Sequence, residues 1–284
     1  MTKRFVESSF CEQDVTFEVP LRPESLHDFV GQEKVREQLE VLIGAAKKRG
    51  DVLGHCLFSG PPGLGKTTLS HIISKQMGSQ IIVTSGPVLE RAGDLAGILT
   101  NLKEGDILFI DEIHRLNRTV EEYLYPAMED FQLDLVVDAG PAARSVKVKL
   151  NKFTLIGATT RLGLISAPLR SRFQLSLRLD YYSPDTLMKI LQRTASILRF
   201  EAEHDALYEI ASRSRGTPRI SNNLLRWLRD FAEMRQPGIK ATKKTSENAL
   251  QLISIDKCGL DEMDIRLLNV LIDHYNGGPV GLGT

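Results

Sequence analysis

The sequence predicts an α/β fold, in which a parallel, doubly wound sheet is followed by a smaller helical domain. Between residues 33 and 180, short apolar runs typical of buried strands alternate with helical segments. A glycine-rich loop joins one of these runs to a helix, and beyond Tyr182 the pattern is helical only. Because strands that alternate with helices form parallel sheets, we expect the sheet domain to come first.

Composition limits the class of protein. The chain has 284 residues, of which 42% are hydrophobic, enough for a substantial core. Lys+Arg and Asp+Glu are both 36, so any contact with DNA would have to be local or multivalent. The three cysteines are far apart and form no metal-binding pattern, which indicates reduced cytosolic thiols. No apolar run approaches a membrane span, so we expect a soluble intracellular protein.

The first elements follow from apolar spacing. Residues 1–20 are polar and mixed in charge, which is typical of a loose tail. From Glu33 a helix is expected, with one apolar face made by Val35, Leu39, Leu42 and Ile43. Apolar runs typical of buried strands follow at 55–59, 81–85, 107–110, 153–161 and 175–180. Helical stretches separate the first four, at 67–77, 88–102 and 117–132.

The glycine loop is the first candidate site. Residues 60–67 read Gly-Pro-Pro-Gly-Leu-Gly-Lys-Thr between a strand and a helix, the order of a phosphate-binding P-loop. Glycines let backbone N–H groups approach phosphate oxygens, and the helix N-terminus adds partial positive charge. Lys66 would contact the β- and γ-phosphates, and the Thr67 hydroxyl would coordinate Mg²⁺. An ordinary glycine turn is the alternative, but the full pattern is rare by chance and predicts a nucleoside triphosphate site.

A second candidate site follows the strand at 107–110. Four apolar residues there are typical of a strand buried on both faces, and Asp111 and Glu112 come directly after them. Ligands bind at the carboxyl ends of strands in open α/β sheets. Asp111 would hold Mg²⁺ and Glu112 would orient and polarise the attacking water. A strand followed by a capping aspartate is the alternative.

Residues 131–150 predict a β-hairpin. The segments 132–138 and 144–150 alternate with a period of two around Ala-Gly-Pro-Ala-Ala. One face would carry six apolar side chains, those of Leu133, Leu135, Val137, Val146, Val148 and Leu150. On the other face, acidic residues could oppose lysines, namely Asp134 and Asp138 against Lys147 and Lys149. Two ordinary core strands and a protruding arm that offers apolar residues to a partner both fit this pattern.

A composition change at Tyr181-Tyr182-Ser183-Pro184 marks the second domain. Ser183 can cap a helix with Pro184 at its first position, and 184–256 then follow helical patterns. After Gly259 another helix begins, followed by the glycine-rich segment 277–284. A helix and a glycine-rich turn cannot bury a core alone, so we expect the last domain to be incomplete.

The motifs, in their order along the chain, resemble those of the RuvB family of AAA+ proteins. They are VGQEKVREQLE, GPPGLGKTTL, TSGPVLE, DILFIDEIHRL, EEYLYPAMEDFQLD, GPAARS, FTLIGATTR, APLRSRF, RGTPRI, RDFAE and GGPVGL. EEYLYPAMED and GPAARS are far more specific than the P-loop. The resemblance implies four parts: a tail at 1–20, a large AAA+ ATPase domain at 21–182, a helical lid at 183–256 and a partial winged-helix domain at 257–284.

Site residues carried over from this resemblance are assigned position by position. The implied catalytic residues are Lys66, Asp111, Glu112, Thr160 and Arg172. Thr160, with Thr159 beside it, matches sensor 1, and Arg172 matches the arginine finger that acts on the neighbouring subunit's nucleotide. Arg219 matches sensor 2, and Thr67 and Asp111 would hold Mg²⁺. The positions implied to contact ATP are Leu21, Arg22, Gly63, Gly65, Lys66, Thr67, Thr68, Glu129, Asp130, Phe131, Arg172, Tyr182 and Arg219.

The resemblance also implies a function and partners. RuvB proteins are ATP-driven motors of Holliday-junction branch migration in bacterial recombination and repair, and they form hexameric rings on duplex DNA. We therefore expect a cytoplasmic homohexamer that binds junction DNA, contacts RuvA through the hairpin at 131–150 and joins RuvC in the resolving complex. The alternative is a nucleotide-gated module that binds ATP and RuvA without moving DNA. A clamp-loader-type AAA+ subunit is less compatible with EEYLYPAMED and GPAARS.

Overall fold

The computed structural model describes residues 21–137, 144–235 and 237–281. These residues form two compact units, one from Arg22 to Asp180 and the other from Tyr181 onward together with Leu21. The predicted tail at 1–20 lies outside the described residues. None of the helices in the described ranges is long and apolar enough to cross a membrane.

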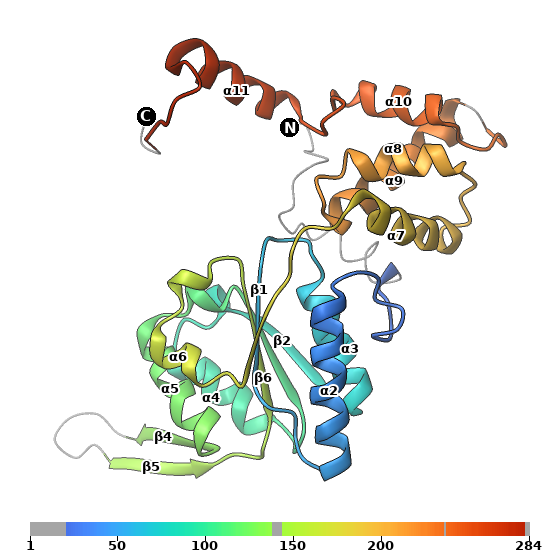
Figure 1. Ribbon diagram of the computed structural model, residues 1–284. Helices are drawn as coiled ribbons and strands as arrows, with labels where there is room; N and C mark the ends of the chain where they lie inside the picture. The colour runs from blue at the N-terminus through green and yellow to red at the C-terminus, as the bar shows by residue number, and fades with distance from the viewer. Residues whose placement is uncertain (1–20, 138–143, 236, 282–284) are drawn as a thin grey trace. The chain divides into compact units, whose positions relative to one another are not determined.

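A five-stranded sheet forms the centre of the first unit (Figure 1). Its order is β2-β3-β6-β1-β7, and every neighbouring pair is parallel. The strands are β1 (Cys56–Ser59), β2 (Ile81–Ser85), β3 (Ile107–Asp111), β6 (Thr154–Thr159) and β7 (Leu175–Arg178). All residues of β1 and β6 are buried, as are the four apolar residues of β3, because helices cover both faces. The predicted α/β class and parallel sheet are confirmed.

Helices cover the two faces of this sheet as two separate groups (Figure 1). One face carries α2 (Glu33–Arg49) and α3 (Lys66–Met77), and the other carries α4 (Ala92–Asn101) and α5 (Arg118–Glu129). The predicted face of α2 is confirmed at three positions, which are buried, while Leu42 is half-buried. Short 3-10 turns complete the loops, at Gly86–Val88, Ile113–Arg115 and Leu162–Leu164, and α6 (Ala167–Ser171) precedes β7.

The predicted hairpin forms a two-stranded antiparallel sheet of its own, made by β4 (Gln132–Val137) and β5 (Arg144–Lys149). Leu133 pairs with Val148 and Asp134 pairs with Lys147, as the alternation predicted. Lys149 pairs with Gln132, and Asp138 and the turn at 139–143 lie outside the described residues. Neither strand joins the central sheet.

Burial differs along the hairpin. Its base belongs to the core, since Leu133 is fully buried and Leu150 is 5% exposed. Further out, Val146 is 46% exposed, and Figure 1 shows the two strands extending away from the helices of the unit. The hairpin therefore has a buried base and an exposed outer part. An exposed strand of this kind presents apolar side chains that a partner can cover.

The second unit is helical, as predicted. Its helices are α7 (Pro184–Ile197), α8 (His204–Ser212), α9 (Pro218–Arg235), α10 (Lys243–Leu252) and α11 (Glu262–Tyr275). Ser183 caps α7 by accepting a hydrogen bond from the Thr186 N–H at 3.2 Å, with Pro184 as its first residue. Leucines from α7, α9 and α10 form a buried centre, whereas α11 contributes no buried residue.

Candidate nucleotide-binding site

The glycine loop begins where β1 ends, beside two neighbouring strands. The Gly60 N–H donates a hydrogen bond to the Thr159 carbonyl at 3.1 Å. Gly60 has a φ of +138°, and a Cβ at this position would lie 2.4 Å from the Leu179 carbonyl oxygen. Gly65, with a φ of +103°, turns the chain directly into α3. Only glycine adopts these conformations without strain, so the sequence pattern corresponds to a real backbone requirement.

Lys66 is the first residue of α3 and is 7% exposed. Its ammonium group donates hydrogen bonds to the carbonyl oxygens of Gly60 at 2.9 Å and Pro61 at 2.8 Å. Thr67 and Thr68 follow in the first helical turn, where backbone N–H groups have no partner within the helix. A buried lysine at a helix N-terminus forms a site suited to phosphate.

Acidic residues stand at the carboxyl end of β3. Asp111 is the last residue of the strand, and Glu112 follows in the left-handed region with a φ of +48°. The Glu112 N–H donates to the Asp111 Oδ1 at 2.9 Å. Because β6 lies between β3 and β1, the ends of these strands and the glycine loop lie at the same edge of the sheet.

Thr160, the predicted sensor 1 residue, lies beside this glutamate. The Thr160 hydroxyl donates to the Glu112 Oε1 at 3.3 Å. The structure therefore brings together, at one edge of the sheet, the predicted groups of the P-loop, the strand end and the sensor.

His114 is a site residue that the sequence reasoning missed. Its Nε2 lies 3.4 Å from the Glu112 Oε2, and its Nδ1 lies 2.9 Å from the Thr159 hydroxyl, which also accepts the Arg161 N–H at 2.9 Å. The pKa of His114 lies below its ordinary value, because the effect of burial outweighs the opposite effect of the neighbouring Glu112 carboxylate. A neutral ring with its proton on Nε2 can donate to Glu112 while accepting from Thr159. The histidine two positions after the acidic pair was the available signal.

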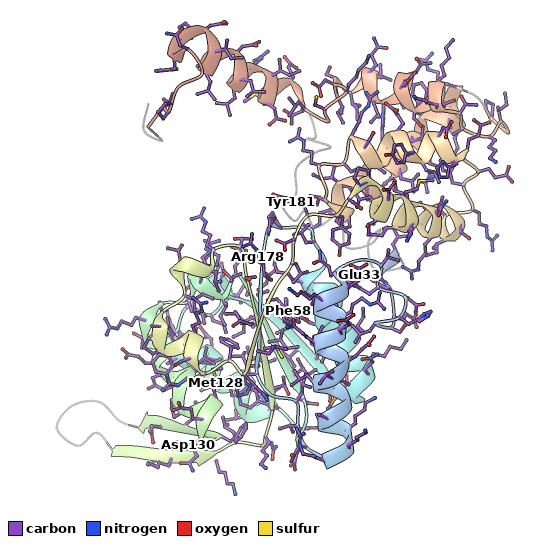
Figure 2. The ribbon with its side chains drawn as sticks, viewed as in Figure 1. Glu33, Phe58, Met128, Asp130, Arg178 and Tyr181 are labelled. Carbon is purple, nitrogen blue, oxygen red and sulfur yellow. The ribbon has the colours of Figure 1, made fainter. Side chains whose placement is uncertain are left out.

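Arg172 does not lie at this edge. It directly follows α6 and precedes β7, whose first residue, Leu175, pairs with Cys56 at the amino end of β1. Arg178, at the other end of β7, pairs with Ser59 beside the glycine loop. Three residue steps at about 3.3 Å each separate these two ends by about 10 Å. Figure 2 shows Arg178 and Met128 at opposite ends of the unit, with Phe58 between them.

The predicted contacts at Glu129, Asp130 and Phe131 also lie at the amino ends of the strands. Phe131 packs against His55 and Phe153, which directly precede β1 and β6, with ring centroids 6.3 and 5.9 Å away. Glu129 forms an ion pair with Arg172 at 3.1 Å. The structure thus groups these three residues with Arg172, and does not bring them to the glycine loop of the same chain.

Four further predicted contacts lie outside the glycine loop and the strand ends. Arg22 belongs to the first unit. Burial of His71 lowers the pKa of that histidine, and the nearby charge of Arg22 lowers it further. In the second unit, the Leu21 carbonyl accepts from Arg193 at 3.0 Å, and the Tyr182 N–H donates to the Gly216 carbonyl at 2.9 Å. Arg219 is in the first turn of α9.

The residues available for a metal are few. Within the described ranges, no group of three or more His, Cys, Asp or Glu side chains could hold a metal ion. Mg²⁺ suits a different arrangement, because it keeps waters and phosphate oxygens and takes only one or two protein oxygens. The Asp111 carboxylate and the Thr67 hydroxyl are oxygen donors of that kind, so the residues present fit a nucleotide-bound Mg²⁺.

Comparison with known proteins identifies the family. The model of the Holliday junction DNA helicase RuvB P-loop domain matches residues 21–179, and that of the RuvB AAA lid domain matches 182–256. The Holliday junction branch migration complex subunit RuvB of Protochlamydia amoebophila is 63% identical, covering 100% of this chain and 85% of that protein. The subunit of Salinibacter ruber is 56% identical, covering 97% and 79%.

Solved structures agree with the sequence comparison. The Thermotoga maritima RuvB Holliday junction branch migration motor superposes with a TM-score of 0.85 at 48% identity, covering 93% of this chain and 83% of that chain. The resemblance and the fold class inferred from the sequence motifs are thereby confirmed, as is a P-loop nucleotide site. This chain belongs to the RuvB family.

Proposed function

We propose that this chain is an ATP-hydrolysing motor subunit that drives branch migration of Holliday junctions in recombination and repair. The observation that carries the proposal is the convergence of Lys66, Glu112 and Thr160 at one sheet edge. It occurs in a chain that is 63% identical, over its whole length, to a branch migration complex subunit. A P-loop with an acidic strand end is suited to hydrolysis of a bound nucleoside triphosphate.

Each group at this edge has a distinct role in the proposed reaction. Lys66 exchanges its two loop carbonyls for the β- and γ-phosphates. Glu112 orients and polarises the attacking water, and the hydroxyl of Thr160 and the ring of His114 hold its carboxylate in place. Thr67 and Asp111 would hold Mg²⁺, which would supply charge neutralisation at the phosphates. Together these groups stabilise charge in the transition state.

Arg172 completes the site from a neighbouring chain. It lies at the amino ends of the strands, about 10 Å along β1 from the glycine loop, so it is poorly placed to reach its own chain's nucleotide. A head-to-tail ring brings one subunit's amino edge against the next subunit's loop. Glu129, Asp130 and Phe131 lie at the same edge and would contact the neighbour's nucleotide as well. This arrangement supports the homohexamer expected of a RuvB protein.

RuvA would bind the outer part of the hairpin at 131–150, RuvC would join the resolving complex, and the ring would encircle duplex DNA in the bacterial cytoplasm. Two features support a partner at the hairpin: its separation from the central sheet and the exposure of Val146. We further propose the division into an ATPase domain at 21–182, a lid at 183–256 and a winged-helix segment at 257–284.

The hairpin proposal predicts two different outcomes for the same substitution at its two ends. Val146→Asp is expected to weaken RuvA binding by about tenfold or more, because apolar anchors carry most of the binding energy of an interface. Its basal ATPase activity and melting temperature should stay near wild type. Leu133→Asp is the control, because a carboxylate at a fully buried position should destabilise the fold by about 3 kcal/mol or more.

Titration with labelled RuvA measures the binding affinity of each variant, and thermal melts measure its melting temperature. A large fall in melting temperature for Val146→Asp would show that the outer hairpin is part of the core. Unchanged RuvA affinity in a stable Val146→Asp protein would remove this strand from the interface.

A synthetic four-way junction tests the function directly. With RuvA and ATP, the wild-type chain is expected to convert the junction into duplex products and to hydrolyse ATP faster when the junction is present. Glu112→Gln should bind the same DNA and give no product. The alternative function is the nucleotide-gated module, and the similarity to a branch migration complex subunit over all of this chain does not favour it. ATP-dependent RuvA binding without product from the wild-type chain would support that rival and contradict a motor.

A further inference from the structure

The surroundings of Arg172 hold its guanidinium group on three sides. Nη1 donates to the Pro168 carbonyl at 2.7 Å, and Nη2 donates to the Glu129 Oε2 at 3.1 Å. The central carbon of the guanidinium lies 4.3 Å from the centroid of the Tyr125 ring, within the range of a cation–π contact. Nε is buried and has no hydrogen-bond partner among the described residues. The side chain is 18% exposed and is therefore largely ordered before any neighbour arrives.

The Tyr125 ring is itself held in place. Its hydroxyl donates to the Glu121 Oε1 at 2.7 Å, one helical turn earlier on α5. Ser166 donates to the same carboxylate oxygen and lies 3.4 Å from the tyrosine hydroxyl. Burial raises the pKa of the Tyr125 phenol, so the hydroxyl keeps the proton that it donates.

Ser166 links this network to the arginine through α6. Its hydroxyl oxygen accepts the Leu169 N–H at 3.2 Å and so caps the short helix α6, which Arg172 directly follows. The ring therefore contacts the guanidinium directly, and the hydrogen bonds of its hydroxyl group fix the start of the helix that directly precedes the same arginine. Both connections run from α5 to α6 and involve no residue of the glycine loop.

We propose that Tyr125, anchored by Glu121 and Ser166, is the positioning residue that orients Arg172 toward the nucleotide of a neighbouring chain. An arginine side chain loses much conformational entropy when it is ordered. If the side chain is already ordered in the isolated subunit, less entropy is lost when the site assembles. Glu129 also orders Arg172, but its negative charge competes with phosphate for the guanidinium. A neutral ring orients the group and leaves its charge available. The inference rests on the proposed action of Arg172 across a subunit interface.

Mixed rings separate a positioning role from a structural one. In a mixture of Arg172→Ala and Glu112→Gln chains, the first supplies an intact Glu112 and the second an intact Arg172. Tyr125→Ala is added either to the chain that supplies Arg172 or to the chain that supplies Glu112. ATPase activity is expected to fall about tenfold in the first placement, the loss of one desolvated cation–π contact, and to stay within about twofold in the second. The fall should be in kcat, with KM for ATP little changed.

Conservative variants sharpen the comparison on the chain that supplies Arg172. Tyr125→Phe keeps the ring and should retain most activity, whereas Tyr125→Leu keeps bulk without a π-face and should resemble Tyr125→Ala. Tyr123→Leu is the matched control, because Tyr123 is on the same helix and also packs partly buried against the core. It should leave the mixture unaffected.

Each result decides between named readings. Equal losses in both placements would mean that Tyr125 only stabilises the fold, and no loss in either would mean that Arg172 needs no such support. Either result overturns the inference. The mixture of Arg172→Ala and Glu112→Gln chains with Tyr125 intact could also show no ATPase activity despite subunit exchange. That result would overturn the proposed action of Arg172 across the interface, and this inference with it.

Discussion

Two inactive variants, Arg172→Ala and Glu112→Gln, are expected to recover ATPase activity when they share a ring. Each variant alone should hydrolyse ATP about 10³-fold or more slowly, because each lacks one catalytic group at every interface. In a mixed ring, some interfaces pair an intact Glu112 from the Arg172→Ala chain with an intact Arg172 from the Glu112→Gln chain. Those interfaces contain every catalytic group, whereas a ring of either variant alone contains no complete interface.

The amount of recovery follows from random assembly. At equal concentrations, about one quarter of the interfaces should be complete, and the fraction should fall on either side of that ratio. Steady-state ATPase assays across mixing ratios, with subunit exchange measured by fluorescence transfer, give the curve. A monomeric enzyme predicts no recovery at any ratio. If ATPase activity did not recover at any ratio although subunit exchange was confirmed, Arg172 would not belong to the active site.

Local features of the site were predictable from the sequence. The P-loop is a pattern of eight consecutive residues, and its glycines meet local backbone demands such as the φ of +138° at Gly60. The buried strand before Asp111 is visible as a run of apolar residues. Likewise, Ser183 and Pro184 predict the start of α7, because serine caps helices and proline is favoured at the first helical position. In each case the determinant lies within a few residues of its effect.

Features that depend on tertiary contacts were not predictable from the sequence. Whether the hairpin joins the central sheet depends on strand pairing, since its alternation fits either answer. The contact of Tyr125 with Arg172 joins residues 47 positions apart, on two helices whose meeting no local pattern announces. His114 was missed for a similar reason. Its role comes from Thr159, which is distant in sequence and reaches it only through the parallel pairing of β6 beside β3.

Nucleotide binding is expected to depend on Lys66 more strongly than on any other single side chain of the site. In wild type, an ATP analogue at about 100 times its dissociation constant should add about 2.7 kcal/mol to the free energy of unfolding, a rise of several degrees in melting temperature. Lys66→Ala should show no such rise, because the positive charge over the β- and γ-phosphates is gone. Glu112→Gln should keep it, because the amide leaves the phosphate contacts and Asp111 intact.

Lys75 on the same helix provides the matched control. It is exposed and forms an ion pair with Glu24, so Lys75→Ala removes an equal charge without touching the loop. We expect a wild-type shift from that variant. Lys66→Ala also loses the hydrogen bonds to Gly60 and Pro61, so its nucleotide-free melting temperature must be measured as its own baseline. A full shift for Lys66→Ala above that baseline would mean that the glycine loop and helix N-terminus bind phosphate without the lysine.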